Sequence, residues 1–308
     1  MSQQLVSFNF VNVKFSFGKP ANVGAKLRST QTRTYITDFL VISDDVLALI
    51  RIPENAIELC RIDTTNSTAS LQTICFLELP PLMPYARLTS ASIETENNHS
   101  KSTTHPRRRP HRPPPRYSFS PSPTESLVLL TLTAKITTSA LMDMPRRTYT
   151  LAMHARTLLS YASPSSQASR LSHPLVVPWG TWGLLATRCF EGPSRSSPSM
   201  VVVAGQRWLD IKCGVIRDFC PHHVRRARRA AGTTNHLVGL RSSTLAAGRV
   251  FECDIESALP YCEIPLEKDA SDSSFVAEDA MIDLERVVLL TTVSGLNRHL
   301  FLLHAMMT

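Results

Sequence analysis

The chain has 308 residues, of which 43% are hydrophobic and 19% charged, and its formal net charge at pH 7 is +8. This composition is normal for a globular protein with a sizeable core. Proline (21 residues) outnumbers glycine (11), which argues against a mainly helical fold because proline interrupts helices.

The cysteines and the apolar runs indicate the compartment. The seven cysteines are scattered and contain no Cys-x-x-Cys pair, which is typical of reduced thiols rather than of a disulfide framework. No hydrophobic leader follows Met1, and the apolar run 287–293 is far shorter than the roughly 20 residues of a membrane helix. We therefore expect an intracellular protein, in the cytoplasm or nucleus, without membrane contact.

The first eighty residues predict strands. Residues 1–36 are an N-terminal segment that the sequence pattern does not assign to the domain. Within it, apolar and polar side chains alternate over 6–17, which predicts one strand. Four short apolar runs follow, separated by turn-forming residues: 39–43, 47–52, 57–62 and 71–79. Four strands in about forty residues are the content of one β-propeller blade.

Two polar segments interrupt this pattern. Residues 86–123 lose their periodicity and include the arginine- and proline-rich tract 107–116, which predicts a disordered insertion. A second polar loop is predicted over 163–177. We therefore expect one β-propeller-like domain over 37–308 with these two interruptions.

The region 178–211 carries the chain's three tryptophans. Trp179 and Trp182 lie in a Pro/Gly setting, ahead of the apolar run 200–204, and Gly205-Gln206 predicts a tight hairpin turn before Trp208. Strands that carry tryptophan and are joined by turns indicate a radial or sandwich-like β fold. Further strands are predicted, and only 224–231 has reasonable helical content; the strands are 127–132, 149–153, 211–219, 250–255, 280–283, 286–293 and 299–305.

No nucleotide-binding, hydrolase or calcium-binding motif occurs, so we expect no enzyme, no cofactor and no metal. One cluster, formed by Cys213, Cys220, His222 and His223, contains metal-ligand residue types. Six residues separate the two cysteines, more than the two to four of usual structural zinc sites. The preferred interpretation is therefore two strand cysteines and two turn-capping histidines.

A hydrolase or metalloenzyme is a further hypothesis for the function. It requires a deep pocket lined by His222, His223, Asp210 or Asp218, because the members of a catalytic constellation need only meet in space.

The charges are unevenly distributed. Six Lys/Arg and no carboxylate lie in 101–116, whereas eleven Asp/Glu lie in 252–285 beside a single lysine. Four arginines occupy 225–229, and they predict either a phosphate-contacting helix or, preferably, a solvated basic turn that faces the acidic region. Nucleic-acid binding through 107–116 and 225–229 is thus the alternative function.

Several segments, taken in order, resemble one group of proteins; they are 38–45, 77–82, 148–159, 178–183, 187–190, 205–208, 217–226, 258–261 and 281–286. The group is the C-terminal β-propeller-like region of F-box-domain proteins from mushroom-forming fungi (basidiomycetes). The resemblance implies an all-β fold, a degenerate or incomplete β-propeller, with disordered Pro/Arg/Ser-rich insertions. No F-box motif precedes Phe39, so binding to a ubiquitin-ligase adaptor is not carried over.

The resemblance also implies a function. We expect a non-enzymatic protein-interaction module with an unknown protein partner, comparable to a substrate-receptor region. Tryptophan and arginine dominate interface hot spots. The interaction surface is therefore predicted at Trp179, Trp182, Arg188 and Trp208.

Overall fold

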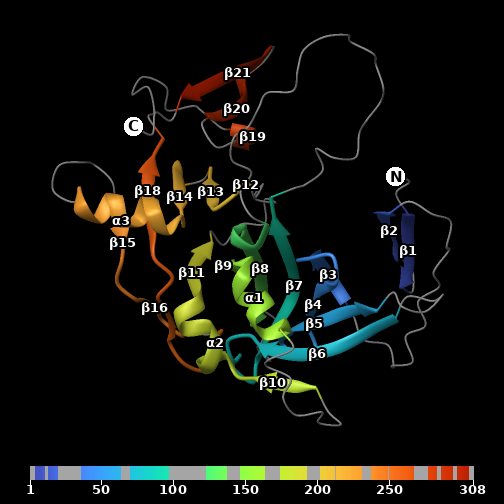
Figure 1. Cartoon of the computed structure of the whole chain (residues 1–308). Helices are drawn as coiled ribbons and strands as arrows, with labels where there is room; N and C mark the ends of the chain where they lie inside the picture. Colours follow the sequence, from blue (N-terminus) through green and yellow to red (C-terminus); the bar gives the residue numbers. More distant parts are fainter. Residues whose placement is uncertain are drawn as a thin grey trace.

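The fold is mostly β, as predicted. A computed structural model describes residues 4–10, 13–19, 36–63, 70–96, 123–136, 146–163, 174–192, 202–211, 213–230, 237–248, 250–266, 277–282, 286–293 and 297–304. Three larger sheets follow one another along the chain, accompanied by short helices (Figure 1). No helix in the described ranges is long and apolar enough to cross a membrane.

The first large sheet confirms the four predicted strands. It is an antiparallel meander of β3 (Ile36–Val41), β4 (Val46–Arg51), β5 (Ala56–Asp63) and β6 (Ser70–Glu78). A short strand, β10 (Leu175–Val177), adds to β6 in parallel. This strand lies within the predicted polar loop 163–177 and shortens it.

In the second large sheet, the inner strand β8 (Leu127–Ile136) has buried side chains on both faces. The sheet consists of β7 (Ala86–Thr95), β8, β9 (Arg147–His154) and β11 (Thr187–Gly192). The near-continuous apolar sequence of β8 explains its burial, since alternate side chains point to opposite faces.

The strand β7 corrects the sequence prediction, which assigned 86–95 to a disordered insertion. Its few apolar residues, Leu88, Ala91 and Ile93, are buried, but a register shift between Leu88 and Ser90 breaks their alternation. That irregularity, with the many polar residues, hides the strand from a period-2 pattern. Residues 97–122 and 164–173 lie outside the described part of the chain, so the predicted disorder there is not addressed.

The third large sheet carries the predicted hairpin. Its order is β12 (Val202–Ala204), β13 (Arg207–Asp210), β14 (Val215–Asp218), β18 (Tyr261–Pro265) and β15 (Leu237–Gly239). The turn at 205–206 is confirmed, and Gly205 adopts a left-handed φ of 58° that suits glycine in a hairpin turn.

Smaller sheets complete the described strands. The predicted strand 6–17 is a hairpin of β1 (Gln4–Phe10) and β2 (Val13–Lys19), and a second pair is β16 (Ser243–Leu245) with β17 (Ile255–Ser257). A three-stranded sheet near the C-terminus comprises β19 (Ala277–Ile282), β20 (Arg286–Val293) and β21 (Asn297–His304). None of the sheets within the described ranges closes on itself.

Within the described ranges, three α-helices and the 3-10 turn η2 (Pro123–Glu125) interrupt the strands. Helix α3 (Pro221–Arg229) matches the predicted helical segment, but α1 (Ala155–Ala162) and α2 (Trp179–Ala186) were not predicted. The sequence of α2 contains two glycines, which lower helix propensity. Gly183 leaves room for the Trp179 ring, because a Cβ there would lie 2.4 Å from that ring. Tertiary packing stabilises α2, since Trp182 is buried in the core and its Nε1 donates to the Glu78 carbonyl of β6.

The hydrophobic core has two main parts. The larger cluster lies between the first and second sheets and includes Trp182 and Phe251. The second cluster packs Leu127 and Leu129 of β8 against Trp208 and Phe219 of the third-sheet region. The second sheet is therefore the central layer, and it supports the third sheet, on which α3 rests.

Candidate functional site

The candidate site is built around Asp218, the last residue of β14. Arg207 and Asp218 are directly opposite each other in the β13–β14 pairing, which places their side chains together. Arg207 Nε donates to Asp218 Oδ2 at 2.9 Å, and the Asp218 side chain is fully buried. A buried ion pair of this kind is maintained only when further hydrogen bonds satisfy both groups.

Asp218 also fixes the beginning of α3. Its Oδ1 accepts a hydrogen bond from the Cys220 backbone N–H at 2.8 Å, which forms a turn immediately before the helix. Pro221 then occupies the first helical position, where its missing N–H costs nothing. Val224 and Ala227 are buried beneath the helix, so α3 is attached to the sheet both by this turn and by its apolar side.

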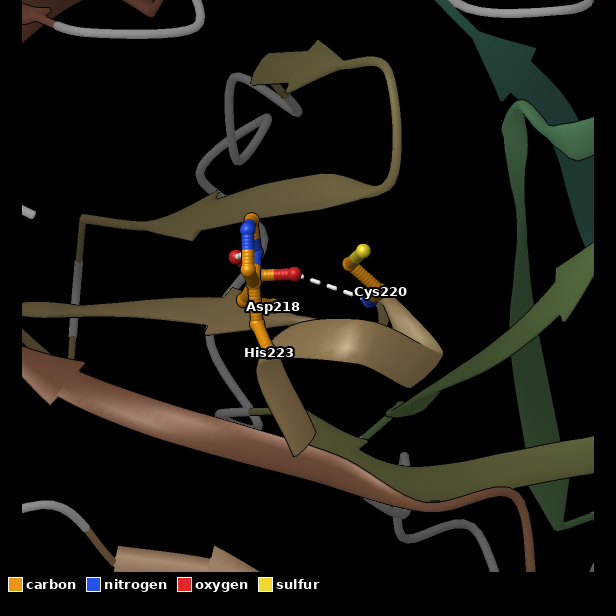
Figure 2. Close-up of side chains that lie close together, drawn as sticks. All are labelled: Asp218, Cys220 and His223. Atoms are coloured by element: carbon orange, nitrogen blue, oxygen red, sulfur yellow. Dashed lines mark hydrogen bonds and ion pairs between the residues drawn. The ribbon is translucent and has the colours of Figure 1, made fainter. Parts of the chain in front are cut away.

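His223 completes a group of three side chains with Asp218 and Cys220. His223 Nδ1 lies 2.8 Å from Asp218 Oδ2. The Cys220 Sγ, a carboxylate oxygen of Asp218 and a ring nitrogen of His223 lie within 4.8 Å of one another, where β14 meets α3 (Figure 2). The hydrogen bond to Asp218, together with Cys220, raises the pKa of His223 to about 10, so its ring is an imidazolium at neutral pH.

The other two groups respond to the same charges. Burial acts to raise the pKa of Asp218, but His223 and Arg207 outweigh it and lower that pKa. Burial likewise opposes ionisation of Cys220, yet His223 and the first amide N–H groups of α3 lower the pKa of its thiol. His223 therefore favours the ionised forms of both Asp218 and Cys220.

A metal ion fits this group poorly. The side chains are of metal-ligand types, but Asp218 Oδ2 already accepts from both Arg207 and His223, and Oδ1 accepts from a backbone N–H. The Arg207 cation, whose side chain is 10% exposed, would also repel any cation bound to Asp218. The geometry favours a charge network of protein groups.

The His223–Asp218 pair makes stability depend on pH. Because the pKa of His223 rises from 6.5 to about 10 on folding, the folded chain holds a proton that the unfolded chain releases between these values. The stabilisation is complete below pH 6.5 and is lost as the pH rises towards 10. The side chain is 43% exposed, so we expect about 1 kcal/mol after solvent screening.

Urea unfolding at several pH values measures this contribution. The difference in free energy of unfolding between the unmodified chain and His223→Gln should shrink from pH 6.5 to 10, whereas His222→Gln should show no such trend. A difference that stays constant over this range would contradict the ion pair.

The outer side of α3 presents four arginines. Arg225, Arg226, Arg228 and Arg229 are all exposed, and their spacing of three and four residues places them along one side of the helix. We call this surface the arginine face. No ion pair joins these four guanidinium groups to a carboxylate whose side chain the structure describes, a set that leaves out residues 267–285. Arg225 Nη2 lies 3.2 Å from His222 Nδ1.

Nearby carboxylates are already used by another arginine. Arg217 pairs with Asp210 Oδ2 at 2.5 Å and with Glu263 Oε1 at 2.9 Å, and its guanidinium lies over the Phe190 and Trp208 rings. The expected contact between 225–229 and the acidic region 252–285 is therefore not formed by Glu263. The side chains of residues 267–285 of that region, which include most of its carboxylates, lie outside the described part of the structure.

Three of the four predicted interaction residues lie in the interior. Trp182 is 2% exposed, and Arg188 and Trp208 are each 6% exposed. Arg188 donates to the Arg241 carbonyl at 2.7 Å and covers the Tyr261 ring, so it links elements inside the protein. Only Trp179 is partly exposed. An interaction surface must therefore be sought elsewhere, and the arginine face is the strongest candidate.

The residues of the predicted metal or hydrolase cluster are only partly brought together. Cys220, His223 and Asp218 meet, whereas Asp210 pairs with Arg217, and Cys213 and His222 are not in the group. Sequence reasoning missed Arg207. The signal was present, because a hairpin centred on Gly205-Gln206 and a second turn at 211–214 place Arg207 opposite Asp218.

Comparison with known proteins adds no identification. No protein-family model matches the chain, and no curated protein or solved structure is similar enough to match it. The resemblance to fungal F-box-domain proteins therefore stays a prediction, and function must be argued from the site itself.

Proposed function

We propose that the protein is a non-enzymatic interaction module that binds an acidic segment of a protein partner through the arginine face of α3. The observation that carries this proposal is the set of four exposed guanidinium groups on one side of α3, for which the described side chains supply no carboxylate partner. Exposed arginines on one side of a helix supply planar donors that match carboxylates two bonds at a time.

The anchoring of α3 supports this role. The Asp218 turn holds the first residue of the helix, and Val224 and Ala227 bury its opposite side. A surface held in place before binding loses little conformational entropy when the partner arrives. The arginine face is thus already ordered in the absence of a partner.

A protein partner is favoured over nucleic acid. The helix has nine residues, which corresponds to a length of about 13 Å. No Phe, Tyr or Trp lies between Phe219 and Phe251 to stack on bases, as single-strand binders require. The arginine face therefore fits a short acidic peptide, and duplex binding is an outcome that the test must separate.

The architecture that we propose for this module is an incomplete β-propeller. Two four-stranded antiparallel meanders, β3–β6 and β7-β8-β9-β11, have the strand content of blades, and the five-stranded sheet β12-β13-β14-β18-β15 follows them. The resemblance to the region behind the F-box of fungal proteins supports the same fold and suggests a receptor for a protein ligand. Its partner is then recognised by negative charge.

A charge-matched pair of variants tests the proposal. We expect a fluorescently labelled glutamate-rich peptide to bind the unmodified chain, with affinity measured by fluorescence anisotropy. Replacement of the four α3 arginines by glutamine should weaken binding about 30-fold or more, at roughly 0.5–1 kcal/mol per exposed pair.

The control variant removes the same charge from another surface. It replaces four exposed arginines of the second-sheet region by glutamine, namely Arg87, Arg146, Arg147 and Arg156. This control should bind the peptide almost as the unmodified chain does. Equal losses in both variants would mean that net charge alone attracts the peptide, and the arginine face would not be a site.

A further inference from the structure

Cys220 differs from the chain's other cysteines in its surroundings. Four cysteines (Cys60, Cys75, Cys189 and Cys262) are buried, and Cys213 and Cys253 are exposed, whereas Cys220 is partly exposed. Burial raises the pKa of Cys75, Cys189 and Cys262 to about 12, which keeps those thiols protonated and unreactive. Cys220 is reachable from solvent and adjoins an imidazolium.

Two cations contact Asp218 beside Cys220. They are Arg207 on β13 and His223 on α3. Cys220 Sγ lies within 4.8 Å of a ring nitrogen of His223 and of a carboxylate oxygen of Asp218, so the imidazolium favours a thiolate at Cys220. His222 on α3 and Cys262 on β18 are the other titratable groups nearby; the Cys262 thiol donates to the Asp218 carbonyl at 3.7 Å.

The position of Cys220 adds a second stabilising effect. It is the N-cap residue of α3, the end of a nine-residue helix where unpaired amide N–H groups favour a negative charge. A cysteine beside both a helix N-terminus and a histidine cation is the environment in which thiolates form near neutral pH. The position of Cys220 at the helix N-terminus and the charge of His223 thus both favour a thiolate.

We propose that Cys220 is a reactive thiolate that hydrogen peroxide oxidises to the sulfenic acid. The sulfur attacks one peroxide oxygen, so that an S–O bond forms as the O–O bond breaks. The second oxygen leaves as hydroxide and takes the proton of the His223 imidazolium to become water. Sulfur loses two electrons, and the peroxide gains them. Asp218 orients His223 and is a positioning residue.

This inference is independent of the arginine face. It uses a side chain on the first turn of α3 and needs no acidic partner, so each proposal can fail without the other. It also needs no deep pocket, because hydrogen peroxide is small enough to reach a partly exposed thiol.

Alkylation rates test the thiolate. The intact chain is treated briefly with iodoacetamide between pH 5.5 and 9, and mass spectrometry of its peptides gives a rate for each cysteine. At pH 6 we expect Cys220 to react about ten times faster than exposed Cys213, with a rate that rises less steeply with pH and levels off at a lower pH. Cys213 should follow the usual rise of about ten-fold per pH unit.

Histidine variants test the mechanism. His223→Gln should slow Cys220 at pH 6 about ten-fold and restore the steep pH profile, whereas His222→Gln should leave both unchanged. Hydrogen peroxide followed by dimedone, which traps sulfenic acids, should label Cys220 in the unmodified chain and not in His223→Gln. If His223→Gln fails to fold, the pH profile of the unmodified chain still decides. A Cys220 profile parallel to that of Cys213, or the absence of the dimedone adduct, would overturn the proposal.

Discussion

Replacing Asp218 by alanine is expected to lower the free energy of unfolding by about 3–5 kcal/mol, because it removes one partner of a buried ion pair. Arg207, whose side chain is 10% exposed, would lose the carboxylate that its Nε contacts at 2.9 Å. The Cys220 N–H and the His223 ring would lose the same acceptor. The start of α3 should therefore loosen together with the sheet.

Urea unfolding measures this loss. Asp218→Asn keeps an oxygen for the Cys220 N–H but removes the charge, so it should fall between alanine and the unmodified chain. Asp44→Ala, at an exposed turn, is the control and should change stability by less than about 0.5 kcal/mol. A loss below about 1 kcal/mol for Asp218→Ala would show that Asp218 does not hold this junction together.

Replacing Trp182 by alanine is expected to cost about 3–5 kcal/mol, as large-to-small changes of aromatic core residues do. The side chain is 2% exposed and belongs to the main core cluster. Its Nε1 donates to the Glu78 carbonyl at 2.8 Å, and its ring packs edge-on against Trp179. The variant would lose the contact that attaches α2 to β6.

This prediction also separates a core role from a surface role. Thermal unfolding should show the destabilisation, while the folded fraction of Trp182→Ala should bind the acidic peptide with unchanged affinity. Trp179→Ala, at a partly exposed position, should be milder. A Trp182→Ala variant that is fully stable but no longer binds the peptide would restore the tryptophans as the interaction surface.

The strands of the first sheet were predictable because burial imposes a visible pattern, whereas β7, β15, β16 and β18 were not predicted and the predicted strand 250–255 is not formed. The four runs that became β3 to β6 are short, apolar and separated by turn formers, so local chemistry alone defines them. Gly205-Gln206 likewise predicted the hairpin turn between β12 and β13 from local sequence alone. By contrast, α2 was not predictable, since Trp182 stabilises this helix through contacts with β6 that no local pattern reveals.

The candidate site was predictable only in part. The sequence indicates Asp218, Cys220 and His223 as candidate metal ligands or catalytic groups. Their role depends on which charged side chains surround them. Arg207 argues against a metal site, because its guanidinium pairs with the Asp218 carboxylate across the β13–β14 pair. This ion pair could be predicted only once the register of β13 and β14 was known. The arginines of 225–229 were visible from the sequence, but their lack of described carboxylate partners was not.

The most direct test of the arginine face compares two ligands of equal charge. A labelled glutamate-rich peptide and a labelled DNA duplex are each titrated with the intact chain and with the four-arginine variant, at low and at physiological salt. We predict that the peptide binds more tightly than the duplex at physiological salt and that the variant loses peptide binding. Tighter binding of the duplex, with an affinity that falls by about 0.9 log units per log unit of salt for each phosphate neutralised, would contradict the proposed protein partner.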